Sequence, residues 1–398
     1  MPLQTLPCRA FQRGFALGAR LLPGRTPTVL SGAGSLLKLP DVFSREGASR
    51  PLVVASRRQC ADERFLALRA ALEGRGIRPS VFSGVEPDPS VATVEKLAAQ
   101  YRTDGCDSFL VLGGGSPIDA AKVAAARIVR PDKTVAQLGG LLKVRRPLPL
   151  FIAVPTTTGT GSEAPIAAVV TGEEHRKYAV SDLCLIPRYA VLDPTLTLSL
   201  PPAVTAQTGM DALTHAVEAY LSLYYNTRET RALAETAVRD IFRYLPVACR
   251  DGQSLTARER MLRASFDAGC AFTRASVGNV HAIAHTLGGL YGIPHGLACA
   301  VTLPVVLEDY GVAVHPRLAR LGSLIGLTGT ERVRAVGFLA AIRALNASLG
   351  IPDRFDGIRG EDLPRMAAWA AAEANPVYPV PVVYAQARFR RVLERLRA

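Results

Sequence analysis

The strongest constraint on the fold is a change of pattern along the chain at Asp193-Pro194. Before this point, short apolar runs alternate with stretches of helical spacing, whereas after it nearly every stretch has the period of an amphipathic helix. Strands alternating with helices imply a mostly parallel sheet with helices on both faces. We therefore predict an α/β domain over residues 1–193 and an all-helical domain over residues 194–398.

The predicted elements follow from apolar runs, helical spacing and the Gly and Pro residues that end them. Strands are expected at residues 51–56, 78–85, 109–112 and 148–154. Helices of the first domain are expected at residues 11–22, 61–75, 88–101 and 117–129. Helices of the second domain are expected at residues 203–223, 228–245, 257–272, 277–287 and 332–349, with an alanine-rich helix at residues 367–374.

Composition narrows the class of protein. Of 398 residues, 48% are hydrophobic, and no apolar run is long enough to cross a bilayer. Seven cysteines form no C-x-x-C pair, which favours a reducing compartment, and we expect a cytoplasmic protein. The first acidic residue is Asp41 and the segment before it is rich in arginine, so a mitochondrial transit peptide is the alternative to a folded N-terminal helix.

The net charge of +13 leaves nucleic-acid binding open as a function. The basic residues are dispersed and lack interleaved aromatic side chains, so we expect neither a nucleic-acid nor a membrane partner. The expected partner is a small molecule. We also expect a homodimer, in which an edge strand near the N-terminus pairs across a two-fold axis.

A glycine-rich loop follows the predicted strand at residues 109–112. Gly113, Gly114 and Gly115 let a phosphate approach the backbone without meeting a Cβ atom. Ser116 is expected to cap the next helix, with Pro117 at its first position and Asp119 closing a capping box. The resulting helix N-terminus suits a pyrophosphate, although an ordinary tight turn would show the same residues.

A second loop, residues 156–163, follows the next strand and is rich in threonine and glycine. Two such loops at the carboxyl ends of neighbouring strands favour a dinucleotide. Ser56, Arg57 and Arg58 end the strand at residues 51–56, where a carboxylate would bind a ribose hydroxyl. Because no carboxylate stands there, we predict NADP(H) rather than NAD(H).

Five residues of the second half have the types and spacing of a divalent-metal site. Asp211 and His215 are four residues apart, as are His281 and His285, so each pair shares one face of a helix, and His295 follows closely. Three nitrogen donors and one oxygen suit Fe²⁺ or Zn²⁺ better than Mg²⁺ or Ca²⁺. Spacing alone leaves open which four of the five bind.

The motifs G-G-G-S-x-x-D-x-A-K, T-T-x-G-T-G-S-E, G-M-D-A-L-T-H-A-x-E and H-A-x-A-H…P-H-G occur in this order. Together they resemble the iron-containing (group III) alcohol dehydrogenases over nearly the whole chain. The resemblance implies a dehydroquinate synthase-like fold and hydride transfer between a primary or secondary alcohol and NAD(P)⁺. Glycerol dehydrogenase-, maleylacetate reductase- and hydroxyacid–oxoacid transhydrogenase-like activities share this architecture, and a metal-dependent hydrolase is the more remote alternative.

The same resemblance implies roles for individual residues. Asp211, His215, His281 and His295 would bind Fe²⁺, or Zn²⁺ in its place. His285 would face substrate and nicotinamide as the catalytic histidine. The residues expected to bind the cofactor are Ser56, Arg57, Asp88, Gly114, Gly115, Ser116, Pro117, Asp119, Thr156, Thr157, Thr160, Ser162 and Lys177.

Overall fold

The chain divides into two compact units in a computed structural model that describes residues 5–19, 24–172 and 177–398. Residues 25–199 form an α/β unit, and residues 1–24 with 200–398 form a helical unit. The α/β-then-helical order agrees with the sequence. The structure differs in grouping the N-terminal helix α1 (Leu6–Ala19) with the helical unit, whereas the sequence-based division kept residues 1–193 together.

Within the described residues, the α/β unit contains a six-stranded parallel sheet of order β1-β9-β6-β4-β2-β3. Its strands are β1 (Thr28–Ser31), β2 (Pro51–Val54), β3 (Ser80–Phe82), β4 (Ser108–Gly113), β6 (Leu150–Pro155) and β9 (Tyr189–Leu192). The four predicted strands are confirmed within a few residues. The sequence led us to expect an edge strand near the N-terminus without giving its range, and β1 lies there; the strand β9 was not predicted.

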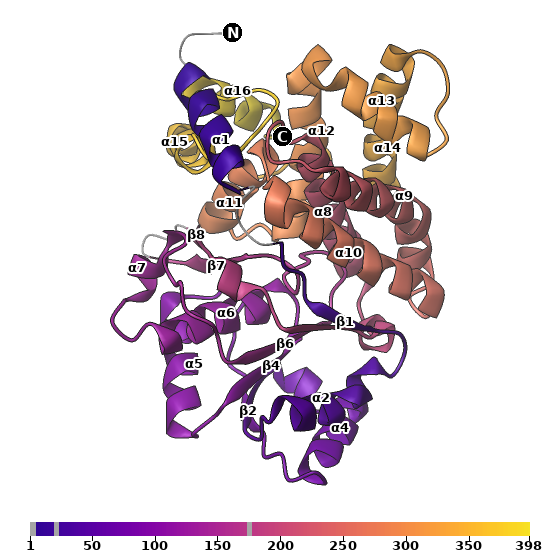
Figure 1. Cartoon of the computed structure of the whole chain (residues 1–398). Helices are drawn as coiled ribbons and strands as arrows, with labels where there is room; N and C mark the ends of the chain where they lie inside the picture. The colour runs from indigo at the N-terminus through magenta and orange to yellow at the C-terminus, as the bar shows by residue number, and fades with distance from the viewer. Residues whose placement is uncertain (1–4, 20–23, 173–176) are drawn as a thin grey trace. The chain divides into compact units, whose positions relative to one another are not determined.

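Strand β4 is buried along its whole length, and its side chains alternate between two cores. Phe109 and Val111 pack with residues of α5 (Val91–Thr103) and α6 (Gly115–Val129). Leu110 and Leu112 pack with residues of α2 (Leu39–Glu46) and α4 (Glu63–Glu73) on the other face. Figure 1 shows these two helix layers on either side of the sheet. Two buried faces explain why the strand reads as a continuous apolar run.

Neighbouring strands β2 and β4 lead into connections that run in opposite directions across the sheet. The chain goes from β2 through α3 (Arg57–Cys60) and α4 to the edge strand β3, but from β4 through α6 to β6 on the other side. Open α/β sheets bind ligands at such a switch point, outside the carboxyl ends of the strands. Ser56 and the glycine loop at Gly114 follow these two strand ends.

A small second sheet, of order β5-β8-β7, was also not predicted. It contains β5 (Gly140–Leu141), β7 (Ala167–Thr171) and β8 (Lys177–Ser181), and β7 pairs antiparallel with β8. A short helix α7 (Val135–Leu138) precedes it. The strand β8 places Lys177 beside the loop that carries Asp88.

The helical unit is built around one large core of apolar side chains. Its helices are α8 (Pro202–Leu221), α9 (Arg228–Arg250), α10 (Leu255–Ala275), α11 (Asn279–Tyr291), α12 (His295–Tyr310), α13 (His315–Leu324), α14 (Glu331–Ser348), α15 (Leu363–Ala374) and α16 (Gln386–Arg395). The five long helices predicted in this half are confirmed at α8, α9, α10, α11 and α14, and the alanine-rich helix expected at residues 367–374 is confirmed at α15. The helices α12, α13 and α16 were missed.

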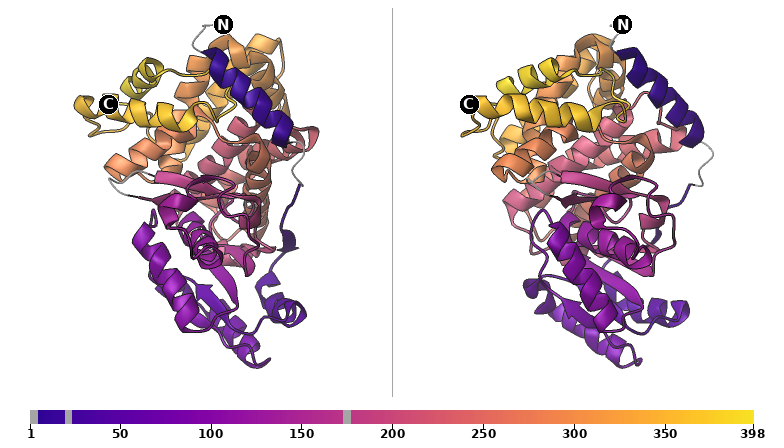
Figure 2. Two further views of the ribbon diagram at one scale, coloured as in Figure 1. Left: turned by 60° about the vertical axis from the view of Figure 1, so that its left-hand side comes forward. Right: turned by 90° about the vertical axis from the view of Figure 1, so that its left-hand side faces the viewer.

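Helix α1 lies along the helices of the C-terminal half (Figure 2). Buried polar side chains hold it there. Arg9 Nη1 donates to the carbonyl of Val380 at 2.7 Å, and Gln12 Nε2 donates to that of Tyr378 at 2.7 Å. A folded N-terminal helix is therefore confirmed, and it starts earlier than the expected residue 11. The expected end at Leu22 lies outside the described residues.

One stretch, His295–Leu324, is long and apolar enough to cross a membrane by length and composition. The sequence had led us to expect none. Most of this stretch, 67% of its most apolar window, is buried inside the protein. Its helix α12 packs against α8, α11 and α14, so core packing accounts for its composition.

Candidate metal centre and nucleotide loops

Three helices of the helical unit bring the predicted metal ligands together. Asp211 and His215 lie one turn apart on α8, His281 and His285 one turn apart on α11, and His295 is the first residue of α12. Gly296 allows this arrangement, because a Cβ there would lie 2.3 Å from the backbone oxygen of Gln207 on α8. The close packing of α12 on α8 thus positions His295 beside Asp211.

The spacing of the polar atoms fits a bound ion. Asp211 Oδ1 lies 3.5 Å from His295 Nε2, 3.8 Å from His281 Nε2 and 3.9 Å from His215 Nδ1. Donors at about 2.1 Å from a tetrahedral ion would lie about 3.4 Å from one another. The observed separations are slightly longer than these edges and too long for direct hydrogen bonds.

Two atoms of this cluster are buried without a partner. Asp211 Oδ1 and His281 Nε2 form no hydrogen bond with any residue in the described parts of the chain. The side chains of Asp211 and His281 are only 2% and 3% exposed. Burial raises the pKa of Asp211 to about 6, against the lowering effect of His281. A cation would remove the cost of burying this carboxylate, so these residues fit a divalent ion.

The ring of His281 is oriented by Glu218, a carboxylate that was not among the predicted site residues. Glu218 Oε2 lies 2.6 Å from His281 Nδ1 and also accepts a hydrogen bond from the amide of Gly278. A carboxylate only accepts hydrogen bonds, so Nδ1 carries the proton and Nε2 faces Asp211 with its lone pair. Burial lowers the pKa of His281, but the hydrogen bond and charge of Glu218 outweigh it and raise the pKa overall.

His285 lies beside the cluster and has its own carboxylate partner. Its ring stacks on that of His295 at a centroid distance of 5.2 Å. Its Nδ1 lies 2.7 Å from Glu373 Oε1 on α15, and the Tyr378 hydroxyl donates to the same oxygen at 2.7 Å. This places the proton of the neutral His285 ring on Nδ1 and leaves Nε2 as an acceptor.

In the α/β unit, the glycine loop lies against the second loop. A Cβ on Gly114 would lie 2.9 Å from Thr157 Oγ1, and one on Gly115 would lie 2.9 Å from Thr160 Cγ2. Thr156 receives a hydrogen bond from Gln59 and donates its own amide to the Gly113 carbonyl. The two predicted loops therefore form one continuous surface.

The predicted cap of helix α6 is wrong. The helix begins at Gly115 with Gly114 as its N-cap, and no side chain caps it. Ser116 and Pro117 thus lie within the first turn. Asp119 accepts a hydrogen bond from the amide of Val169 at 2.9 Å instead of closing a capping box. An N-terminus without a side-chain cap leaves its N–H groups to a ligand or to water.

Two further predicted cofactor residues, Lys177 and Asp88, come together beside this helix. Lys177 Nζ lies 2.6 Å from Asp88 Oδ1, and the Asp88 amide donates to Ser116 Oγ at 3.3 Å. Asp88 adopts a left-handed backbone conformation (φ 56°), which turns the chain toward the loop. Ser162 is buried in the second loop, where its amide donates to Thr160 Oγ1.

The end of strand β2 differs in character from these loops. The Ser56 hydroxyl accepts from the Gln59 amide in a capping box that begins α3. Arg57 and Arg58 are both exposed to solvent. Among the described residues, the structure therefore places a hydroxyl side chain and two exposed cations directly after β2.

Residues 26–194 match the profile of the iron-containing alcohol dehydrogenases, and residues 205–395 match that of the C-terminal part of the Fe-containing alcohol dehydrogenase family. The chain belongs to the iron-containing alcohol dehydrogenase family. It is an oxidoreductase of the alcohol dehydrogenase type, as the motifs had indicated.

Its relatives cover most of the chain. A 1,3-propanediol dehydrogenase of Klebsiella pneumoniae is 40% identical over 313 residues, 76% of this chain and 80% of that protein. The solved structure of a 1,3-propanediol oxidoreductase has a TM-score of 0.88 at 33% identity and covers 95% of this chain and 100% of its own. A sulfoacetaldehyde reductase from Bifidobacterium kashiwanohense, solved with NAD⁺, has a TM-score of 0.82 at 29% identity, covering 94% and 98%. The predicted fold class is thus confirmed.

Sequence reasoning missed the residues that orient the histidines. Glu218 stands at the end of the quoted motif G-M-D-A-L-T-H-A-x-E, seven residues after Asp211, so helical spacing could have placed it on the same face. Glu373 lies far along the chain in an alanine-rich helix, and no local signal marks it. Cys299 follows His295 by four residues, the spacing of the other two pairs, and was also overlooked.

Proposed function

We propose that this enzyme interconverts small primary or secondary alcohols with their aldehydes or ketones, using NAD(P)(H) and a divalent ion. Asp211, His281 and His295, together with His215, would hold the ion. A divalent ion there supplies Lewis acidity toward the substrate oxygen, and the nicotinamide supplies or takes the hydride. The observation that supports this proposal is the pair of buried, unpartnered atoms Asp211 Oδ1 and His281 Nε2.

The chain's own residues orient the groups that meet substrate. Glu218 holds the proton of His281 on Nδ1, so the ring cannot turn its lone pair away from Asp211. Glu373 does the same for His285, whose Nε2 is then free to accept the alcohol proton and pass it toward solvent. We assign His285 as the catalytic histidine on this basis.

The nucleotide would lie along the surface made by the two loops of the α/β unit. The first turn of α6, with Gly114, Gly115 and Ser116, would bind the pyrophosphate through backbone N–H groups. Thr156, Thr157 and Thr160 would add hydroxyl donors from the second loop. Lys177 carries a positive charge beside the same helix end, although Asp88 already pairs with it.

We further propose NADP(H) over NAD(H), because β2 ends in a hydroxyl residue and two exposed arginines rather than a carboxylate. A similar protein solved with NAD⁺ shows that the fold accepts the other cofactor. The homodimer and the cytoplasmic location expected from the sequence stay predictions.

Metal analysis combined with NADPH oxidation over a panel of aldehydes and ketones tests the proposal. The wild-type protein should contain about one iron or zinc ion per chain and oxidise NADPH only when a carbonyl substrate is present. His281→Ala should lose both metal and activity. His285→Ala should keep the metal and turn over at least tenfold more slowly, since general acid–base catalysis contributes about 10²–10⁴-fold. Metal loss in both variants, or in neither, would contradict these roles.

A further inference from the structure

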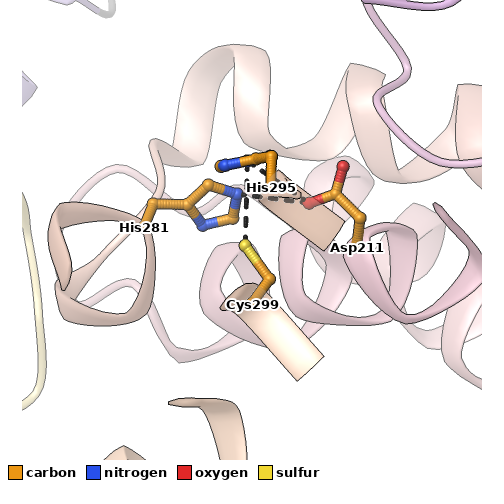
Figure 3. Close-up of side chains that lie close together, drawn as sticks. All are labelled: Asp211, His281, His295 and Cys299. Carbon is orange, nitrogen blue, oxygen red and sulfur yellow. Dashed lines mark hydrogen bonds and ion pairs between the residues drawn. The ribbon is translucent and has the colours of Figure 1, made fainter. Parts of the chain in front are cut away.

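The sulfur of Cys299 lies inside the candidate metal cluster. Cys299 is buried on α12, one turn after His295, and its Sγ is 3.7 Å from His295 Nε2. One donor atom from each of Asp211, His281, His295 and Cys299 lies within 4.8 Å of the other three. Figure 3 shows the four side chains pointing toward one another from α8, α11 and α12.

A second, independent observation indicates that a ligand binds between these four side chains. Asp211 Oδ1 and His281 Nε2 are directed into this cluster, and both are buried without a hydrogen bond from the described residues. A sulfur at about 2.3 Å and a nitrogen at about 2.0 Å from a tetrahedral ion lie about 3.5 Å apart. The 3.7 Å between Cys299 Sγ and His295 Nε2 fits this edge.

The position of His215 differs from that of these four residues. Its ring stacks between two neighbours, with centroids 4.4 Å from His281 and 4.4 Å from Phe272. Its nearer nitrogen is 3.9 Å from Asp211 Oδ1, the longest of the three histidine contacts to that atom. The 3.7 Å contact of the sulfur with His295 Nε2 is thus no longer than the 3.9 Å contact of the His215 nitrogen with Asp211 Oδ1.

We propose that Cys299 binds the divalent ion of this centre as a thiolate, alongside Asp211, His281 and His295. The proposal rests on the metal centre of the proposed function and adds a donor to it. On binding, the Sγ–metal bond forms and the thiol proton is released to solvent. A thiolate makes the donor set softer, which shifts selectivity from Fe²⁺ toward Zn²⁺.

Cobalt substitution tests the proposal without measuring activity. The protein is stripped with a chelator, reloaded with Co²⁺ and analysed for cobalt content. A thiolate ligand gives a strong sulfur-to-cobalt charge-transfer absorption in the near ultraviolet, which nitrogen and oxygen ligands lack. We expect one cobalt per chain and this absorption in the wild type. Cys299→Ser should lose the absorption, whereas Cys249→Ser, on α9 outside the cluster, should keep it.

The outcomes separate the two proposals. Cobalt bound by the wild type without the absorption would overturn the role of Cys299 and leave the metal centre standing. A wild-type protein that binds no cobalt would overturn both. If Cys299→Ser does not fold, a variant that keeps only Cys299 and has serine at the other six cysteines must retain the absorption. In competition between zinc and iron, Cys299→Ser should lower the zinc-to-iron ratio by about tenfold or more.

Discussion

At the scale of single residues, the centre depends on side chains that never touch an ion. Glu218 and Glu373 each bind one histidine of α11 through Nδ1, so both rings present Nε2. Outer carboxylates of this kind typically change metal affinity or activity by about 10–100-fold. The two glutamates should therefore affect different steps, since His281 faces Asp211 whereas His285 lies beside the cluster.

We predict that Glu373→Gln lowers kcat by about 10–100-fold with little change in metal content. The amide can present its NH₂ group to Nδ1, which would place the ring proton on Nε2 and remove the acceptor. Steady-state kinetics and metal analysis of the same preparation check this. Glu361→Gln serves as the control, because it removes an exposed charge just before α15, the helix that carries Glu373. Equal loss of metal and activity would contradict the assignment.

Cofactor choice is also decided by single residues. We predict that Arg57→Ala lowers kcat/KM for NADPH by about tenfold and leaves that for NADH nearly unchanged, because a charge-assisted hydrogen bond contributes about 1.5–3 kcal/mol. Arg69→Ala, a surface arginine paired with Glu73 on α4, is the matched control. A wild-type enzyme that prefers NADH would rule out the proposed preference.

At the scale of elements, helix α5 begins at a polar cluster whose charge depends on pH. Glu86 Oε1 accepts from the Ser90 amide at 2.9 Å and from the Thr93 hydroxyl at 2.8 Å. Burial raises the pKa of Glu86, but these hydrogen bonds outweigh it and lower the pKa to about 2. A carboxyl with a lower pKa in the folded state stabilises the fold above its unfolded pKa.

The lowered pKa of Glu86 predicts how the stability of the fold depends on pH. Above the unfolded pKa of about 4.3, Glu86→Gln should lower the Tm of the α/β unit by about 2–4 °C. The difference should shrink as the pH falls from there toward about 2, because the wild-type carboxyl then becomes protonated. Thermal unfolding of wild type and variant across this range is the measurement, with Glu95→Gln on the same helix as control. A difference that grows on acidification would contradict it.

Elements differed in how well the sequence predicted them. The buried strand β4 and helices such as α8 and α9 carry long periodic patterns, so their type was clear. The strands β1, β5 and β9 are two to four residues long, too short for a period to show. Helix α12 was missed because it is apolar on nearly all sides, as expected of a helix surrounded by others.

The same distinction holds for the site. Asp211, His215, His281 and His285 were visible as pairs because a helix turns spacing into proximity. The contact of Glu373 with His285 joins residues 88 positions apart, which no local pattern encodes. The expected cap at Ser116 failed because the helix begins two residues earlier, with Gly114 as its N-cap, and helix ends are the least predictable feature of a helix.

At the scale of the whole molecule, each unit has its own apolar core, and each is expected to hold a different ligand. A ligand present at 100 times its Kd stabilises the folded state by about 2.7 kcal/mol. We therefore predict that calorimetry resolves two transitions. NADPH at that excess should raise one by roughly 5–10 °C, and chelation of the metal should lower the other.

Adding different metal ions to the chelated protein provides the control for this prediction. Mg²⁺ added to the chelated protein should not restore the lowered transition, because it prefers oxygen ligands, whereas Zn²⁺ or Fe²⁺ should. A single transition that both ligands shift equally would mean that the two units unfold together, which would contradict the predicted pair of transitions.

The hydrogen bonds of Arg9 and Gln12 to residues 376–381 have a consequence for synthesis on the ribosome. Residues 25–199 can collapse as soon as they have emerged, but Arg9 meets its hydrogen-bond partner Val380 only after 371 further residues have been added. At about 5–20 residues per second, that delay lasts roughly 20–70 s. During this interval the nascent chain carries an amphipathic helix whose Arg9 and Gln12 side chains lack these partners, which is the form that chaperones would meet.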